Sequence, residues 1–414
     1  MTAAEAPPVR MSVLRAMLVL GVLEAFGPLS MDVYMPQLPH LARSFDAPDA
    51  LAQWTMSACM IGLGLGQLIA GPLSDRFGRR RPLVIGVAAF AVLSAACAVA
   101  PSIDILLIAR FLQGIAGSAG LVISMAVARD MFRGVELSRM LSMLGLVSGS
   151  APVIAPLIGG QLALFMDWRG VFWVLTGVGT ALIALVVFGL PETLSPAGRH
   201  GGGFAALRTH VGAVLRDRLF VAVLVVSATA GVGFFAYLSM SSFVLEQEFG
   251  LTPQLFSFVF AANAVANIVG GQCSRLIVAR MTPQRVYLLG ATATAASTVA
   301  LLALALAGAR LGFIVAALVL FMFCVGLSGP NGTTLALTHH GARAGTAAAV
   351  MGMSSFVVGP IVAPIISSWG TTAVIMAAAM TAASLVGVVV AWVAVRPAAR
   401  GIGPGTAPIA VVEA

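Results

Sequence analysis

The stretch Gly71-Pro72-Leu73-Ser74-Asp75-Arg76-Phe77-Gly78-Arg79-Arg80-Arg81-Pro82 decides the fold of this 414-residue chain. It holds five charged residues in twelve, although only 9% of the whole sequence is charged and 59% is hydrophobic. Long apolar segments lie on both sides of it, which predicts a loop between two membrane spans. Its two glycines and two prolines allow a tight turn. Its arginines favour the cytoplasmic side, and the acid among them favours a shaped hinge over an ordinary anchoring loop.

The composition places nearly all of the chain in lipid, because its mean hydropathy is +1.02. The net charge of +8 comes from 23 arginines and no lysine, scattered over short loops, so we expect no nucleic-acid binding. The four cysteines stand singly in apolar segments without a Cys-x-x-Cys spacing. They are expected to be small buried side chains, neither bridges nor metal ligands. No cleavable signal peptide is expected.

Runs of about 20 apolar residues between charged or Pro/Gly breaks predict twelve membrane spans. With both termini in the cytoplasm, 19 of the 23 arginines fall in cytoplasmic segments and three outside, which predicts this orientation. The predicted spans are 12–35, 51–73, 82–101, 103–127, 137–162, 168–190, 219–243, 253–276, 284–308, 311–337, 344–367 and 370–395.

The longest polar segment, 191–218, divides the chain into two halves. We therefore expect an all-α membrane protein of twelve transmembrane helices in two six-helix, pseudo-symmetric bundles, 1–190 and 219–396, followed by a cytoplasmic tail, 397–414. One trace of an internal repeat supports the duplication. After the eighth span, Gly270-Gly271-Gln272-Cys273-Ser274-Arg275 stands where Gly71-Pro72-Leu73-Ser74-Asp75-Arg76 stands after the second.

Three motifs resemble those of the major facilitator superfamily. Gly71 to Arg80 resembles its signature loop, Arg110-Phe111-Leu112-Gln113-Gly114 its fourth-helix motif, and Ala155-Pro156-Leu157-Ile158-Gly159-Gly160 its fifth-helix antiporter motif, with Ala155 where glycine is usual. Within the superfamily, Leu29-Ser30-Met31-Asp32-Val33-Tyr34-Met35-Pro36 and Gly341-Ala342-Arg343-Ala344-Gly345-Thr346-Ala347-Ala348-Ala349 resemble the Bcr/CflA drug-resistance exporters. The resemblance implies proton/drug antiport, with phenicols, bicyclomycin-like compounds and other small hydrophobic or cationic drugs as substrates.

Three ionisable residues, Glu24, Asp32 and Arg110, lie inside predicted spans, where a charge costs at least about 2.5 kcal/mol. Glu24 and Asp32 are separated by about 12 Å along a helix and about 80° around it, so both can face one cavity. Burial disfavours the charged carboxylate, which suits these acids to take up a proton outside and release it inside. The alternatives are a helix cap for Asp32, since prolines follow it closely, and a structural hydrogen bond for Glu24.

Arg110 and Gln113 lie one turn apart on the same face of the fourth span. The Arg110 guanidinium stays charged and must find acceptors. Our hypothesis is that Arg110 and Gln113 organise the proton site and couple Asp32 or Glu24 to the cavity. The alternative for Arg110 is a snorkelling anchor near the outer surface.

The loop between the second and third spans is predicted to latch the cytoplasmic side in one transport state. In this hypothesis Asp75 accepts hydrogen bonds from the amino end of a helix in the second half, whose dipole favours an anion, while Arg76 and Arg79 pair nearby. Proton or drug binding would then shift the balance between outward and inward forms. The latch residues are Gly71, Asp75, Arg76, Gly78 and Arg79.

Small residues and prolines in the fifth span predict a tight interface between the two halves, since small residues let another backbone approach and prolines bend the helix. The alternative is a tolerated kink. The residues are Gly149, Pro152, Pro156, Gly159 and Gly160.

A drug pocket is predicted from aromatic, methionine and amide side chains, because such surfaces adapt to varied ligands. Asn263 and Asn267, four residues apart, mark an inward face of the eighth span. His339 and His340 lack a third ligand and are expected at a solvated helix end without a metal. The predicted substrate-binding residues are Tyr34, Met56, Gln113, Phe235, Tyr237 and Asn263.

These features favour a proton-driven exporter of drugs in the cytoplasmic membrane. The alternative is a proton-coupled importer of a small nutrient with the same fold. A membrane enzyme is disfavoured because the serines have no histidine partner inside the bilayer. No nucleotide-binding loop is present, so we expect no cofactor and a proton gradient as the energy source. A monomer surrounded by lipid is expected, since such a bundle needs no partner to cover its spans.

Overall fold

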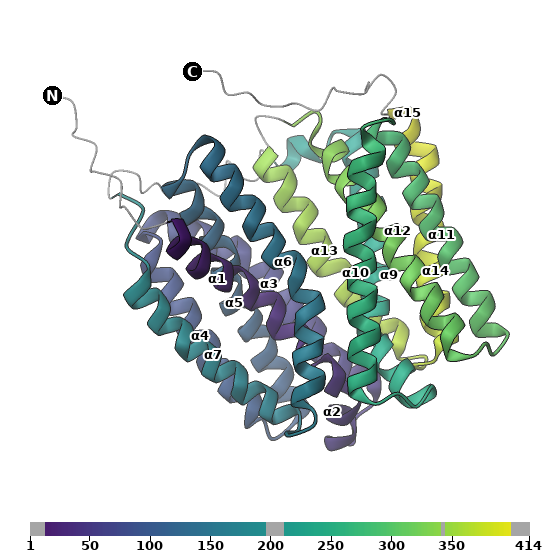
Figure 1. Ribbon diagram of the computed structural model, residues 1–414, viewed down its shortest axis with the longest axis horizontal. Helices are drawn as coiled ribbons and strands as arrows, with labels where there is room; N and C mark the ends of the chain where they lie inside the picture. The colour runs from purple at the N-terminus through teal and green to yellow at the C-terminus, as the bar shows by residue number, and fades with distance from the viewer. Residues whose placement is uncertain (1–12, 196–210, 341–343, 399–414) are drawn as a thin grey trace. The chain divides into compact units, whose positions relative to one another are not determined.

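The computed structural model describes residues 13–195, 211–340 and 344–398, and helices make up nearly all of this part of the chain (Figure 1). Some predictions concern residues outside these ranges. They are the predictions for the N-terminal residues 1–12, the centre of the linker at 196–210, the segment 341–343 and the tail at 399–414.

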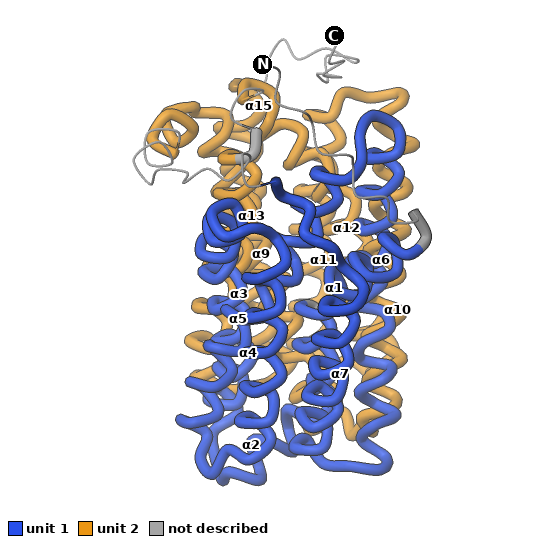
Figure 2. The backbone as a smooth tube through the Cα atoms, turned by 90° about the vertical axis from the view of Figure 1, so that its left-hand side faces the viewer, with its two compact units in different colours: residues 1–202 blue, residues 203–414 orange. Residues whose placement is uncertain are grey.

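The chain forms two compact units, Met1–Gly202 and Gly203–Ala414, called unit 1 and unit 2 below (Figure 2). The division falls inside the predicted linker, 191–218. The predicted outer limits of the bundles, the linker and the tail stay predictions.

In unit 1 the helices are α1 (Val13–Asp32), η1 (Met35–Gln37), α2 (Leu38–Ser44), α3 (Asp49–Phe77), α4 (Arg80–Ala98), α5 (Ile103–Met131), α6 (Gly134–Leu162) and α7 (Trp168–Gly189). In unit 2 they are α9 (Arg218–Phe243), η3 (Val244–Glu248), α10 (Pro253–Val278), α11 (Pro283–Leu306), α12 (Leu311–Leu337), α13 (Ala344–Ser367), α14 (Ala373–Val390), η5 (Ala391–Val395) and α15 (Arg396–Ala398).

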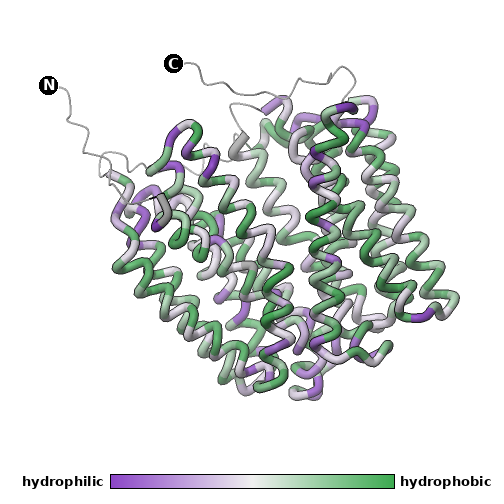
Figure 3. Tube along the Cα trace, in the orientation of Figure 1, coloured by the Kyte–Doolittle hydropathy of each residue, from purple (hydrophilic) through white to green (hydrophobic). Residues whose placement is uncertain are grey.

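Among the described residues, 11 helices are long and apolar enough to cross a membrane, or up to 12 if a bent pair near the N-terminus is one span. That pair, Arg15–Gly27 and Leu29–Ser44, bends by 41°. Hydrophobic residues run along the helices, and hydrophilic ones gather toward the helix ends and loops (Figure 3). The predicted class, an all-α membrane protein, is confirmed. The first predicted span, 12–35, covers α1 and reaches the short 3-10 helix η1 that follows it.

Helices α3 and α5 of unit 1 touch through their backbones. A Cβ on Gly62 would overlap the carbonyl oxygen of Phe111, and a Cβ on Gly114 would overlap that of Cys59. Only glycine fits where backbones come this close, so these two positions fix how the helices are aligned.

Unit 2 repeats this contact between α10 and α12. A Cβ on Gly270 would overlap the carbonyl oxygen of Phe323, and a Cβ on Gly326 would overlap that of Asn267. Gly270 thus makes in unit 2 the same kind of close backbone contact that Gly62 makes in unit 1. The predicted repeat, which set Gly270 opposite Gly71, stays a prediction.

We expect Gly114→Ala to lower the melting temperature of the purified protein by several degrees. The added methyl group overpacks the α3–α5 contact, at a cost of about 1–3 kcal/mol. Gly145→Ala in α6 is the matched control, because a Cβ there meets nothing within 4 Å among the described residues. Equal melting temperatures for the two variants, measured in detergent, would contradict the proposed contact.

Candidate functional site

Arg79, between α3 and α4, is the centre of a charge network at one end of unit 1. Its Nε donates to Asp130 Oδ2 at 2.8 Å, and its Nη1 donates to Asp75 Oδ1 and, at 2.9 Å, to Ser74 Oγ. The Arg79 side chain is buried. Partial burial opposes its charge, but the hydrogen bonds and charges of Asp130 and Asp75 outweigh this, so the pKa of Arg79 is raised.

Glu192, just after α7, binds the first turn of α4 from outside that helix. Its Oε1 accepts from the backbone N–H of Arg79 at 2.8 Å, and its Oε2 accepts from that of Arg80 at 3.3 Å. These N–H groups have no acceptor within the helix, so the carboxylate acts as a cap and complements the helix dipole. Thr193 Oγ1 also donates to Asp130 Oδ2 at 3.2 Å. The segment after α7 is therefore fastened to the loop between α3 and α4.

The predicted latch residues lie in this network only in part. Arg79 pairs with Asp75 as expected, whereas Arg76 lies over the ring of Phe77, 5.1 Å from its centroid. Gly78 ends α3 with φ +89°, a left-handed conformation that favours glycine. Gly71 packs near Val122. A bond from Asp75 to the second half stays a prediction.

Sequence reasoning did not select Asp130 or Glu192. Both are acidic residues in a charge-poor chain, and both are located where predicted spans end. This position is the sequence feature that could have marked them as partners of an arginine. Nothing in the sequence indicates that they contact Arg79, because both lie far from it along the chain.

Arg110 of α5 is the centre of a second polar cluster, inside the helices of unit 1. The residue has 0% exposure, so the snorkelling alternative is wrong. Its Nη1 donates to Gln113 Oε1 at 2.6 Å and its Nε to the carbonyl oxygen of Thr55 at 3.3 Å. Gln113 Nε2 in turn donates to Ser94 Oγ at 2.7 Å. The predicted contact of Arg110 with Gln113 is thus present, and α3, α4 and α5 meet in this cluster.

Aromatic rings cover the Arg110 guanidinium. Its central carbon lies 4.5 Å from the ring centroid of Tyr34 and 5.4 Å from that of Phe172, which are cation–π distances. Tyr34 also shares a hydrogen bond of 3.1 Å with Thr55 Oγ1. Among the described residues, Arg110 forms no ion pair with a carboxylate. Its charge is therefore balanced by dipoles and ring faces.

Glu24 of α1 is buried and accepts two hydroxyl hydrogen bonds. Ser124 Oγ of α5 donates to Oε2 at 2.6 Å, and Ser148 Oγ of α6 donates to Oε1 at 3.2 Å. The alternative of a structural hydrogen bond thus has a geometric basis. These contacts tie three helices of unit 1 together at Glu24.

Asp32 is the last residue of α1 and has 7% exposure. The next residue, Val33, presents its carbonyl oxygen to Gly159 of α6, where a Cβ would overlap it. The antiporter-like motif thus packs against α1 beside Asp32, within unit 1. Gly149, another residue of the interface predicted on the fifth span, is exposed. A contact of α6 with the second half stays a prediction.

The remaining predicted pocket residues divide between the units. In unit 1 Met56 is fully buried on α3. In unit 2 Asn263 Nδ2 of α10 donates to Tyr237 Oη of α9 at 2.9 Å. Phe235 is also buried on α9, and a Cβ on Gly359 of α13 would press on it.

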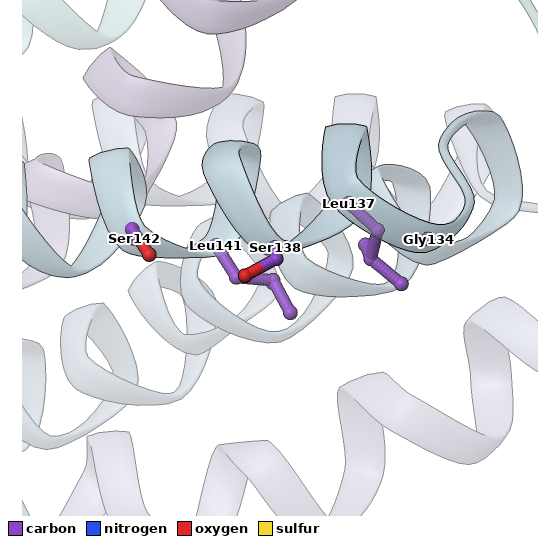
Figure 4. Close-up of a pocket in the computed structure, with 5 residues that line it drawn as sticks. All are labelled: Gly134, Leu137, Ser138, Leu141 and Ser142. Atoms are coloured by element: carbon purple, nitrogen blue, oxygen red, sulfur yellow. The ribbon is translucent and has the colours of Figure 1, made fainter. Parts of the chain in front are cut away.

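A shallow hollow of about 470 Å³ lies along the start of α6 (Figure 4). Its lining comes from the first turns of this helix, whereas Gly159, which packs beside Asp32, is near the other end. The hollow therefore does not coincide with the predicted drug pocket. It is lined by Gly134, Leu137, Ser138, Leu141 and Ser142.

The two histidines differ from each other: the His339 side chain is 51% exposed, whereas His340 is buried. His340 is buried, with its ring edge-on to Phe220, and its Nε2 lies 3.1 Å from Asp217 Oδ2. His339 Nδ1 lies 3.1 Å from the same oxygen. The solvated helix end is therefore wrong for His340. Among the described residues, no group of three or more His, Cys, Asp or Glu could hold a metal ion.

Residues 20–364 match the family model described as Major Facilitator Superfamily. The chain belongs to this superfamily. It is 37% identical over 375 residues to the MFS-type transporter YdgK of Bacillus subtilis, covering 89% of this chain and 92% of that one. It is 28% identical over 354 residues to a bicyclomycin resistance protein homolog of Haemophilus influenzae, covering 85% and 88%.

A third relative is the multidrug resistance protein MdtL of Klebsiella pneumoniae, 29% identical over 331 residues and covering 79% of this chain and 82% of MdtL. The crystal structure of a D-xylose–proton symporter matches with a TM-score of 0.71 at 15% identity, covering 91% of this chain and 97% of the symporter. At that identity the structural likeness shows the superfamily fold alone.

These findings confirm the resemblance to the drug-resistance branch of the superfamily. The protein is a multi-pass membrane transporter of the cell membrane with multidrug-resistance relatives, and it is not an enzyme.

We expect Asp130→Asn to destabilise this superfamily member more than Asp75→Asn. The Asp130 side chain is 19% exposed and that of Asp75 is 52% exposed, and exposed ion pairs contribute little to stability. Melting temperatures of both variants in detergent measure the difference. An Asp75→Asn variant that melts lower than Asp130→Asn would show that the exposed carboxylate is the main anchor.

We expect Arg110→Lys to lower transport about tenfold at equal membrane expression. A lysine ammonium is not flat, so it cannot donate from its edge while its faces stack on two rings as a guanidinium does, and one charged hydrogen bond contributes about 1.5–3 kcal/mol. Arg169→Lys is the matched control, because Arg169 also stacks on an aromatic ring and donates to backbone carbonyls, outside the Arg110 cluster. Similar activity of the two variants would remove the special role of Arg110.

Proposed function

We propose that this transporter is a proton-coupled antiporter that exports small hydrophobic or cationic drugs through the cytoplasmic membrane by alternating access, with both termini in the cytoplasm. The observation that carries the proposal is Asp32, a carboxyl group buried at the end of α1 that forms no ion pair among the described residues. Burial without a counter-ion favours the neutral acid, and such a group can bind and release a proton when its access to water changes.

The neighbours of Asp32 support a coupling role. Val33 is held by the backbone contact with Gly159, and Tyr34 stacks on the Arg110 guanidinium. A change in the charge of Asp32 therefore acts on a segment that touches both α6 and the Arg110 cluster. Glu24, at another depth of α1, is a second acid that can share this function.

The names of the relatives support export as the direction of transport. Two of them are a bicyclomycin resistance protein homolog and a multidrug resistance protein. In our proposal the proton and the drug bind alternately, so that a proton from outside displaces the drug and is released inside. The energy comes from the proton gradient without a cofactor, and the transporter acts as a monomer in lipid.

The charge network around Arg79 is proposed to stabilise one transport state. Asp75 is half-exposed and already within reach of Arg79, so a second partner would compete for its carboxylate. Such a switch needs a difference of only a few kcal/mol between two states.

We expect Asp32→Asn to abolish proton-driven drug accumulation in proteoliposomes while leaving downhill drug exchange in place. An amide cannot carry the proton, but it preserves the shape of the side chain. Asp104→Asn, which changes an exposed acid in the first turn of α5, is the control and is expected to behave like the wild type.

Accumulation of drug against its gradient by Asp32→Asn would overturn the proposed proton site. If the wild type instead takes up a nutrient with protons and gives no resistance to any compound in a panel, the importer alternative replaces export.

A further inference from the structure

Helix α11 and the helix that runs from α14 through η5 to α15 each expose one stripe of residues. In both helices the exposed positions recur every three or four residues, which places them on one side of the helix. Each stripe passes over small and aliphatic side chains and has an arginine at one end. The stripe of α11 includes Arg285, Leu289, Thr292, Ala296 and Val299, and the other stripe includes Leu385, Val389, Trp392, Val393 and Arg396.

Two hydrogen bonds join these stripes near their arginine ends. Trp392 Nε1 donates to Thr292 Oγ1 at 3.0 Å, and Gln284 Nε2 donates to the backbone carbonyl oxygen of Arg396 at 2.7 Å. Both bonds run between α11 and the turns that follow α14. The two stripes therefore lie side by side (Figure 1). The ten residues of the two stripes are called the α11–α14 face below.

The α11–α14 face is apolar along its length and cationic at one end. Its leucines and valines are 44% to 71% exposed, which suits contact with the acyl chains of lipids. Arg285 lies in the first turn of α11, and Arg396 is the first residue of α15. Both arginines are therefore at the end where Gln284 meets Arg396, the level at which a span reaches the lipid headgroups.

The Arg396 guanidinium is held over the Trp392 ring. Its central carbon lies 5.0 Å from the ring centroid, which is a cation–π distance. The ring is fixed in turn by its bond to Thr292. In the part of the chain that the structure describes, the side chains of Arg285 and Arg396 form no ion pair and no hydrogen bond. The N–H groups of both guanidinium groups are thus available to an acceptor.

No carboxylate on the same elements competes for these arginines, since α11, α14, η5 and α15 contain no Asp or Glu. The acids among the described residues of unit 2 are Asp217, Glu246 and Glu248. Asp217 lies beside His339 at the start of α9. Glu246 and Glu248 lie in η3, and Glu248 accepts from the backbone N–H of Ala373 at the opposite end of α14 from Arg396. The charge of the arginine end is therefore open to an anion from outside these elements.

We propose that the α11–α14 face binds an anionic phospholipid. The headgroup phosphate accepts hydrogen bonds from Arg285 and Arg396, because guanidinium groups match the oxygen atoms of a phosphate. Trp392 holds Arg396 at the headgroup level, and the acyl chains lie along the aliphatic stripes. A free phosphate ion would leave these stripes uncovered, so the face fits a lipid better. The assignment does not depend on the cargo or on proton coupling.

The test measures lipid binding to the purified full-length protein by native mass spectrometry in detergent. The probes are dioleoylphosphatidylglycerol and dioleoylphosphatidylcholine, which share their acyl chains and their phosphate but differ in net charge. The variants are Arg285→Gln, Arg396→Gln and, as the matched control, Arg275→Gln. Arg275 is also exposed and lies near the turn that leads into α11, but it belongs to α10 and donates to Gln272 of its own helix.

We expect the wild type to bind phosphatidylglycerol more tightly than phosphatidylcholine. Arg285→Gln and Arg396→Gln are each expected to lose about three- to tenfold in affinity for phosphatidylglycerol alone, the effect of one cation at a headgroup. Arg275→Gln is expected to bind both lipids like the wild type. Equal binding of the two lipids by the wild type would overturn the site, and so would an equal loss in Arg275→Gln, because a diffuse positive charge would then account for the preference.

A competition experiment separates the lipid from its soluble headgroup. Glycerol 1-phosphate carries the phosphate without acyl chains, so we expect it not to displace phosphatidylglycerol from the wild type. Displacement at equal concentration would overturn the lipid assignment. Melting temperatures of the three variants are expected to stay near that of the wild type, since all three side chains are exposed.

Discussion

A charged side chain inside a membrane span must find all of its partners within the protein, because lipid offers none. This constraint accounts for the arrangement of unit 1. Arg110 has no exposed surface, and α3 and α5 supply its acceptors while Tyr34 and Phe172 supply ring faces. The charge of this guanidinium is therefore stabilised only when α3, α5 and the segments that carry Tyr34 and Phe172 have packed around it.

Among the described residues of unit 1, Arg79 and Arg110 are buried, and they are stabilised differently. Arg79, at a helix junction, is paired with Asp130 and Asp75 and sits beside the Glu192 cap of α4. Arg110 has dipoles and aromatic faces in place of a carboxylate. Paired carboxylates fix Arg79 at a helix junction, whereas the surroundings of Arg110 are neutral groups on several helices.

The two units share their helix packing but not their chemistry. The glycine contacts of α3 with α5 recur between α10 and α12, so the backbone scaffold is repeated. On that scaffold unit 1 places acids and an arginine, and unit 2 places amides, hydroxyls and rings. A duplicated fold can diverge in this way because the close contacts depend on glycine backbones, which leaves the other faces of the helices free to vary.

The sequence by itself determined the helical membrane class, the approximate ends of the spans and the position of Asp32, Glu24 and Arg110 inside apolar segments, because apolar length and the place of a charged residue within it are local properties of the chain. It also paired Arg110 with Gln113, since residues one turn apart share a helix face. Only the tertiary structure decided that Asp130 and Glu192 hold Arg79, that two serines hold Glu24, that His340 is buried and that glycines join α3 to α5 and α10 to α12. Those contacts join residues on different helices, and their choice depends on how closely the backbones approach, which no local pattern of residues records.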